Sequence, residues 1–199
     1  MPEQANTFEI ARRKARTGQG ALDLPGLGVL WLAWGPKGLL MLALPSTSTG
    51  DIADAMVDRN LPSPDPVDVP AEYADCLLAY AAGDPVEPAA LPVELIGTSF
   101  QLRVWAALRQ IPRGSVRTYG GIAADIGAPK AVRAVGLANG NNPIAIAVPC
   151  HRVVEAGLRL GGFSAGLPMK RRLLALEGVP VDGERVRPGQ LELWDRLVE

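Results

Sequence analysis

A proline-rich stretch at residues 84–97 divides the 199-residue chain into two halves of opposite charge. Residues 21–97 hold eleven acidic and two basic side chains, whereas residues 98–178 hold eleven basic and three acidic ones. Proline fixes its own backbone and lacks an amide donor, so such a stretch interrupts regular structure. We therefore expect two units joined by a linker, the second with the charge that attracts a polyanion such as nucleic acid. The alternative is a basic face that is merely solvated.

Composition excludes several classes of protein. Hydrophobic residues make up 48% and charged residues 21%, which excludes extensive disorder. Cys76 and Cys150 are too few for a disulfide framework, so we expect a reduced, cytoplasmic protein, nucleoid-associated if bacterial. The chain has no run of 18 apolar residues and no apolar signal core near its start, so we expect no membrane contact. With one histidine and two cysteines, we also expect no metal site.

The N-terminal half predicts a small sheet with helices. Residues 27–34 and 38–44 are apolar runs on either side of a Gly35-Pro36-Lys37 turn, which predicts an antiparallel hairpin. A short helix is expected at residues 51–59. A second helix is expected at residues 71–82, where apolar side chains recur at helical spacing until Gly83.

The C-terminal half predicts a helix-turn-helix. Helices are expected at residues 98–110, 119–126 and 129–138, the last opened by Pro129 and ended by Gly140. The third helix has one long side chain, Arg133, among small ones: Ala131, Val132, Ala134, Val135, Gly136 and Ala138. A smooth helix of this kind can approach a DNA minor groove closely, and a single arginine could enter the base stack. The alternative is a helix packed tightly in a core with Arg133 at its rim.

A candidate nucleophile follows the apolar, strand-like run at residues 144–148. The run ends in Pro149-Cys150-His151-Arg152, which places a thiol, expected to be buried, beside the only imidazole of the chain. A free cysteine has a pKa of about 8.5, so a base oriented by a carboxylate is needed to activate it at neutral pH. Glu177 is the best available acid in the basic half, so Cys150, His151 and Glu177 form a candidate catalytic group.

Residues 98–178 agree in order and spacing with one known family. The matching stretches are Thr98-Ser99-Phe100-Gln101 with Val104-Trp105, Ile111-Pro112-Arg113-Gly114, Arg117-Thr118-Tyr119, residues 129–136, residues 138–143, Pro149-Cys150-His151-Arg152-Val153-Val154, and Lys170 before residues 173–178. They resemble the catalytic domain of the 6-O-alkylguanine-DNA alkyltransferases, the methylated-DNA–protein-cysteine methyltransferases. The resemblance implies an α+β fold: a small N-terminal α/β domain with an antiparallel sheet, ribonuclease H-like, before a mostly helical, winged helix-turn-helix-like catalytic domain.

The expected domain organisation combines the charge pattern with this resemblance. Its parts are a flexible N-terminal arm (1–20), the N-terminal α/β domain (21–83), the linker (84–97), the DNA-binding and alkyl-acceptor domain (98–178) and a C-terminal tail (179–199). The tail, at residues 188–199, is either a docking helix or a flexible end.

The resemblance also implies roles for individual residues. Cys150 would accept the alkyl group, His151 would take its proton through a water, and Glu177 would orient the imidazole. Asn142 would support the turn around the site. Tyr119 would turn the phosphate that swings the damaged nucleotide out, and would contact the purine.

The implied partner is double-stranded DNA that contains an alkylated guanine, bound through the minor groove. The residues expected to contact DNA are Arg133, in the vacated stack, and Tyr119, Thr118, Ala131, Val132 and Ala134. Those expected to line the substrate pocket are Val153, Phe163, Ser164 and Ala165. The thioether product could not be hydrolysed by these groups, so each molecule should act once. No cofactor and no obligate protein partner are implied, and we expect a monomer.

Two residues depart from the family pattern. Phe163 stands where an aromatic with a hydroxyl is common, and Ala165 replaces a common glycine, so the pocket is expected to disfavour bulky adducts.

The main alternative function is a non-catalytic, alkyltransferase-like protein that binds the lesion and recruits other repair factors; such relatives lack the cysteine, which Cys150 supplies here. A helix-turn-helix regulator would need further acceptor cysteines. A cysteine hydrolase is disfavoured because His151 adjoins Cys150 and no separate oxyanion loop is evident.

Overall fold

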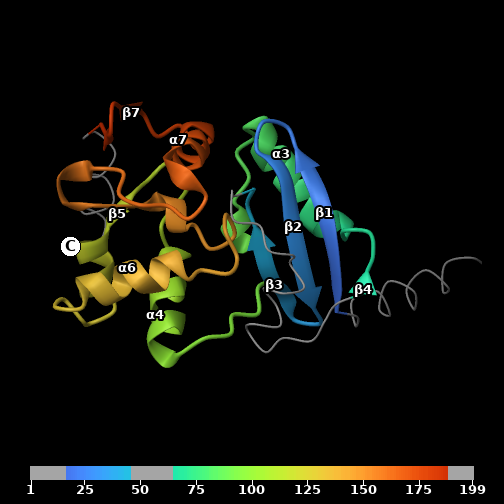
Figure 1. Cartoon of the computed structure of the whole chain (residues 1–199), viewed down its shortest axis with the longest axis horizontal. Helices are drawn as coiled ribbons and strands as arrows, with labels where there is room; N and C mark the ends of the chain where they lie inside the picture. The colour runs from blue at the N-terminus through green and yellow to red at the C-terminus, as the bar shows by residue number, and fades with distance from the viewer. Residues whose placement is uncertain (1–16, 46–64, 188–199) are drawn as a thin grey trace, which may run out of the picture.

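The computed structural model describes residues 17–45 and 65–187, and its N-terminal half is built on a four-stranded sheet (Figure 1). The strands lie in the order β3-β2-β1-β4, antiparallel except that β4 runs parallel to β1. Their bounds are β1 Gly18–Leu24, β2 Gly28–Gly35, β3 Gly38–Ala43 and β4 Asp65–Pro66. The predicted hairpin is confirmed as β2 and β3. Strand β1 was not predicted, and because it begins at Gly18 the expected arm is wrong for residues 18–20.

Helix α3 (Ala71–Ala82) covers the sheet and confirms the helix predicted at those residues. Gly83 ends it in the left-handed conformation at φ 90°, which glycine adopts without strain. Tyr73, Leu77 and Tyr80 are buried, and helix α3 contacts both β1 and helix α7 (Gly166–Leu176). The helix thus lies between the sheet and the C-terminal half.

The segment expected to be a linker packs along the edge of the sheet. It contains the short 3₁₀ helix η1 (Pro88–Ala90). The Leu39 amide donates to the Pro92 carbonyl at 2.9 Å, and the Glu94 amide donates to the Leu39 carbonyl at 2.8 Å. Gly38 makes this approach possible, because a Cβ there would lie 2.4 Å from the Pro92 backbone. Residues 84–97 are therefore a structural part of the sheet edge rather than a spacer.

The C-terminal half is mainly helical. Its helices are α4 Ser99–Leu108, α5 Tyr119–Asp125, α6 Val132–Gly140 and α7, with the 3₁₀ turns η2 Cys150–Arg152 and η3 Ala156–Leu158. Two small sheets join them: the parallel pair β5 (Arg117–Thr118) and β6 (Val153–Val154), and the antiparallel pair β7 (Val181–Asp182) and β8 (Arg185–Val186). Thr98 and Gln101 form a capping box at the start of α4, as the sequence pattern favours. Across the described residues, the fold is a mixed α/β structure with five α-helices and a small, largely antiparallel sheet.

Two local predictions are wrong. Helix α6 begins at Val132, three residues after the expected Pro129, because residues 128–131 form a tight turn in which the Ala131 amide donates to the Ala128 carbonyl. Gly140 is its last residue rather than the stop that follows it. The apolar run at residues 144–148 is not a strand: Ile146 has φ 67°, and the run turns back after a single bridge from Ile144 to Leu42 of β3.

One large cluster of buried side chains runs through both halves. It includes Leu30 and Leu42 of the sheet, Tyr80 of α3, Trp105 of α4 and Val148 beside the candidate nucleophile. A smaller cluster lies under β6 to β8. The helix expected at residues 51–59 and the tail at residues 188–199 lie outside the described residues. Within the described ranges, no helix has the length and apolar character needed to cross a membrane.

Candidate active site

Cys150 is the first residue of η2 and is 5% exposed. A tight turn precedes it, in which the Cys150 amide donates to the Val148 carbonyl at 2.8 Å. Asn142 supports this turn from both ends: its side-chain amide donates to the same Val148 carbonyl at 2.7 Å, and its oxygen accepts from the Ile144 amide at 3.0 Å. The turn fixes where the thiol lies, and Asn142 fixes the turn.

Burial raises the pKa of the Cys150 thiol above its ordinary value. A hydrogen bond from Asn142 and the positive charge of Lys170 favour the thiolate, but they offset the effect of burial only in part. The resting cysteine is therefore protonated at neutral pH. A base close to the sulfur has to take the proton before the sulfur can act as a nucleophile.

His151 is fully buried, and its imidazole is held by Glu177. Its Nε2 lies 2.8 Å from Oε1 of Glu177, which caps the C-terminal end of α7. The other ring nitrogen, Nδ1, makes no hydrogen bond to any described protein atom. The sequence prediction of this histidine–carboxylate pair thus agrees with the geometry, although the two residues lie 26 positions apart.

Glu177 has two further donors. Both of its oxygens accept from the Arg152 guanidinium, Oε2 from Nε and Oε1 from a terminal nitrogen, each at 2.9 Å. The Tyr80 hydroxyl also donates to Oε1, at 2.7 Å. Burial would raise the pKa of Glu177, but His151 and Arg152 outweigh it and hold that pKa well below its usual range. The carboxylate is therefore charged at physiological pH and can stabilise a positive imidazolium.

Known proteins share both the sequence and the fold around this site. Residues 99–179 match the family described as 6-O-methylguanine DNA methyltransferase, DNA binding domain. A methylated-DNA–protein-cysteine methyltransferase of Mycobacterium tuberculosis (strain ATCC 25618 / H37Rv) is 54% identical over 121 residues, which cover 61% of this chain and 69% of the relative. One of Mycolicibacterium paratuberculosis is 53% identical over 117 residues, 59% of this chain and 67% of the relative. The chain belongs to the methylated-DNA–protein-cysteine methyltransferase family.

Solved structures of methyltransferases extend the similarity beyond the matched domain. The crystal structure of the Mycobacterium tuberculosis O6-methylguanine methyltransferase is 41% identical, with a TM-score of 0.68, and the match covers 90% of this chain and 99% of the other. The same organism's OGT in complex with DNA is 42% identical, with a TM-score of 0.66 and coverage of 80% and 92%. The N-terminal half is thus part of the shared fold.

The residues expected to contact DNA lie on α5 and α6 or directly before them. Val132, Arg133 and Ala134 are exposed, whereas Ala131 is half-buried before the helix. Thr118 caps α5 by accepting a hydrogen bond from the Gly121 amide at 3.0 Å. The exposure of Val132 and Ala134 beside Arg133 argues against a helix packed tightly in a core. It agrees with the expectation that this methyltransferase presents α6 to a partner.

Tyr119 links helices α5 and α6 to the reactive centre. It begins α5 and is half-buried, and burial and the neighbouring Cys150 raise its pKa above the ordinary value. Asn139 of α6 lies between them: it hydrogen-bonds to Tyr119 and directs its amide toward the Cys150 carbonyl at 3.5 Å. Asn139 belongs to a motif that the sequence matched, but it was given no role.

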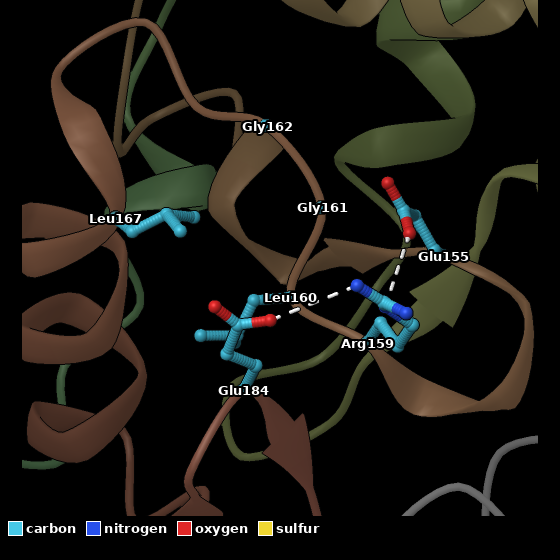
Figure 2. A pocket seen from close by; sticks show the side chains of 7 residues that line it. All are labelled: Glu155, Arg159, Leu160, Gly161, Gly162, Leu167 and Glu184. Carbon is cyan, nitrogen blue, oxygen red and sulfur yellow. Dashed lines mark ion pairs between the residues drawn. The ribbon is translucent and has the colours of Figure 1, made fainter.

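The residues expected to line the pocket follow the nucleophile in the chain. Val153 is buried on β6, Phe163 and Ala165 are half-buried, and Ser164 is exposed before α7. A separate shallow hollow lies beside this segment (Figure 2). In it Arg159 lies between Glu155 and Glu184, at 3.8 and 3.7 Å.

Sequence reasoning missed the groups that support Glu177 and the loop after Cys150. Arg152 lies in the matched motif, but nothing local to it revealed its carboxylate partners. Lys170 is fully buried and donates to the carbonyls of Val153, at 2.6 Å, and Leu160. Tyr80 and Glu87 come from the N-terminal half, and only their distance in space, not any sequence spacing, connects them to the site.

Proposed function

We propose that the chain repairs DNA by direct reversal, moving the alkyl group of 6-O-alkylguanine irreversibly onto Cys150. The observation that carries this proposal is the buried thiol followed directly by an imidazole that a buried carboxylate holds at 2.8 Å. The proposal is supported by relatives named methylated-DNA–protein-cysteine methyltransferase that are more than half identical over the matched region.

The proposed reaction begins with a proton transfer. His151 takes the Cys150 proton through a water at Nδ1, the ring nitrogen that has no hydrogen-bond partner among the described residues. Glu177 stabilises the resulting imidazolium at Nε2. The thiolate attacks the alkyl carbon, a C–S bond forms, and the C–O bond breaks with its electron pair on the guanine oxygen. A proton then returns to the guanine, and the thioether remains on Cys150. These groups offer no means of cleaving the thioether, so each protein acts once.

DNA binding is proposed through α5 and α6, as a winged helix-turn-helix-like unit in the minor groove. The small exposed residues of α6 would allow a close approach, and Arg133 would fill the stack left by the rotated guanine. Tyr119 would turn the phosphate beside that guanine. This part of the proposal is supported by the exposure of Val132, Arg133 and Ala134, and by the relative solved with DNA. The N-terminal half would be the ribonuclease H-like domain.

The proposed substrate pocket is lined by Val153, Phe163, Ser164 and Ala165. The Ala165 methyl group would narrow its wall relative to glycine, so methyl groups would transfer more readily than benzyl groups. The reaction needs no cofactor, and the protein would act as a monomer because a single lesion needs one acceptor cysteine.

The test is intact-protein mass after incubation with a duplex that contains one 6-O-methylguanine. We expect a gain of one methylene mass, saturating at one per protein, and no gain in the Cys150→Ala variant. No gain in the wild type, with the duplex still tightly bound, would overturn the proposal in favour of a lesion-binding protein without chemistry. The same assay with a benzylated guanine tests the narrow pocket, and equal rates for the two groups would exclude it.

A further inference from the structure

A tyrosine of the N-terminal half reaches the carboxylate of the proposed catalytic group. Tyr80 lies on α3 and is fully buried, and its hydroxyl donates to Glu177 Oε1 at 2.7 Å. The same oxygen lies 2.8 Å from His151 Nε2. Tyr80 and Glu177 are 97 positions apart in the chain. The hydroxyl therefore shares one acceptor atom with the imidazole that is proposed to act as the base.

The Tyr80 ring is held in place from the side of the C-terminal half. The Arg113 guanidinium stacks on it, 5.4 Å from the ring centre. Arg113 itself donates to the Leu176 carbonyl at 2.6 Å, one residue before Glu177, and to the Gly83 carbonyl at 3.3 Å, at the end of α3. Because both ring and hydroxyl are fixed, the hydrogen bond to Glu177 is part of the packed structure.

In this hydrogen bond the hydroxyl is the donor, because the Glu177 carboxylate has no proton to give. Burial and the negative charge of Glu177 raise the pKa of Tyr80 far above its ordinary value, so it keeps its proton at any physiological pH. A hydrogen bond donated to a carboxylate disperses part of its negative charge. Oε1 therefore attracts the proton on His151 Nε2 less strongly than it would without Tyr80.

A second contact joins the same two parts of the chain. Glu87, just after α3, accepts from Arg152 at 2.9 Å, and Arg152 also donates to both oxygens of Glu177. Tyr80 and Glu87 together make residues 71–97 a support for the catalytic carboxylate. The charged and titratable groups around the His151–Glu177 pair are Tyr80, Glu87, Arg113, Cys150, Arg152 and Lys170.

We propose that Tyr80 is a positioning residue for alkyl transfer: its hydroxyl fixes Glu177 Oε1 against His151 and sets how strongly the imidazole holds a proton. The inference rests on the proposed function. It makes the N-terminal half a part of the reaction centre, without direct contact between Tyr80 and the substrate. The Tyr80→Phe variant keeps the ring and loses only the donor, so it separates this role from packing.

The experiment measures single-turnover methyl transfer from the methylated duplex, by intact mass, between pH 5 and 9. In Tyr80→Phe the carboxylate attracts the imidazole proton more strongly, so the rise in rate with pH should move upward by about half a unit or more. The plateau rate should also fall several-fold, because Glu177 loses one of the groups that orient it. Tyr73→Phe is the matched control, since Tyr73 is a buried tyrosine of the same helix that packs on Trp34 of the sheet. It should match the wild type.

Two further measurements exclude a purely structural effect. His151 is the only histidine of the chain, so its ring signal in NMR reports its titration without assignment of other histidines. The signal should titrate at higher pH in Tyr80→Phe than in the wild type, in the absence of DNA. In a Glu177→Gln background, where the acceptor has no charge, Tyr80→Phe should no longer shift the titration.

The outcomes separate this inference from the proposed function. A wild-type protein that transfers the methyl group and a Tyr80→Phe variant with the same rate profile and the same histidine titration would overturn the role of Tyr80 alone. A wild type that transfers nothing would overturn the proposed function, while the histidine titration would still decide whether Tyr80 acts on the pair. A shift that persists in the Glu177→Gln background would also refute the inference, because Tyr80 would then act by another route.

Discussion

Arg152 is a side chain whose loss should strongly destabilise the protein. Its guanidinium is fully buried and makes four hydrogen bonds to carboxylates: two to Glu177, at 2.9 Å each, and two to Glu87, at 2.9 and 3.3 Å. A fifth, at 2.6 Å, goes to the Ile111 carbonyl. The Glu177 side chain is fully buried as well, whereas that of Glu87 is 38% exposed. In Arg152→Met, water can reach Glu87 but not Glu177.

The expected cost follows from this difference in exposure. Removing one partner of a buried ion pair leaves an uncompensated charge and costs about 3–5 kcal/mol. Arg152→Met should therefore lower the free energy of unfolding by about that amount. For a chain of this size, each kcal/mol corresponds to a fall in Tm of roughly 2–4 °C, which gives a total fall of roughly 6–20 °C. Tyr80 and His151 still contact Glu177, which favours the lower half of the range.

The assay is urea unfolding at pH 7, with Arg159→Met as the control. Arg159 also pairs with two carboxylates, Glu155 and Glu184, but its side chain is 56% exposed and the distances are 3.8 and 3.7 Å (Figure 2). Such a surface pair contributes less than about 1 kcal/mol. Adding Glu177→Gln to Arg152→Met should restore part of the lost stability, because it removes the buried charge. If Arg152→Met costs no more than Arg159→Met, the argument from burial is refuted.

Two further predictions concern the pH dependence of stability. Burial lowers the pKa of Lys170 from 10.5 to about 8, so between those values the unfolded chain binds a proton that the native protein has released. Relative to Lys170→Met, the free energy of unfolding of the wild type should therefore rise with pH in that window, by up to about 1.4 kcal/mol per pH unit. If the urea midpoints of the two proteins change with pH in parallel, this prediction is refuted. The depressed pKa of Glu177 also makes stability rise with pH, in a lower window: the stability it contributes is present above the ordinary carboxyl pKa of about 4.3 and is lost as the pH falls below it. The loss between pH 5 and 2 should be smaller in Glu177→Gln, and an equal loss would contradict the assignment.

Local signals explain which elements the sequence predicted well. The helix at residues 71–82 has apolar side chains at helical spacing and a glycine stop, and the structure confirms both its ends. The start of α4 was expected at residue 98, and in the structure Thr98 is the residue whose side chain caps the helix. In each case the decisive interaction joins residues fewer than five positions apart. The start of α6 was predicted three residues too early, because Pro129 fits the tight turn at residues 128–131 as well as it fits the first turn of a helix.

Local signals of this kind could not predict strand β1 or the conformation of residues 144–148. Strand β1 contains two glycines and no β-branched residue, so it has little strand propensity, and its pairing with β2 on one side and β4 on the other stabilises it. The run at 144–148 has strand-like composition, yet Ile146 adopts φ 67° and the Val148 amide donates to the Ile144 carbonyl. Pairing with β2 and β4 decides the first case, contacts with β3 and with Asn142 decide the second, and the sequence shows none of these contacts.

The candidate site likewise contains some residues that the sequence could predict and others that it could not. Cys150 and His151 are adjacent, and Glu177 was the best available acid in the basic half, so a chemical argument could find all three. The contact between Tyr80 and Glu177 could not be predicted, because a tyrosine on α3 three residues after Leu77 is already explained as a buried core residue. A tyrosine at such a position differs from phenylalanine only by one hydroxyl, and its partner lies 97 positions away.

The separation of acidic and basic residues between the two halves suggested two separate units, but some of the basic residues serve contacts within the protein. At least four of the eleven basic residues of the C-terminal half bind groups inside the protein rather than facing solvent. Arg109 donates to the Ala89 and Leu91 carbonyls, Arg113 to residues at the end of α3, Arg152 to Glu87, and Lys170 to carbonyls of its own half. Three of these four therefore fasten the C-terminal half to residues 83–91. The charge available to DNA phosphates comes from the exposed groups on the other elements, Arg133 and Lys130 among them, and is smaller than the segment total implies.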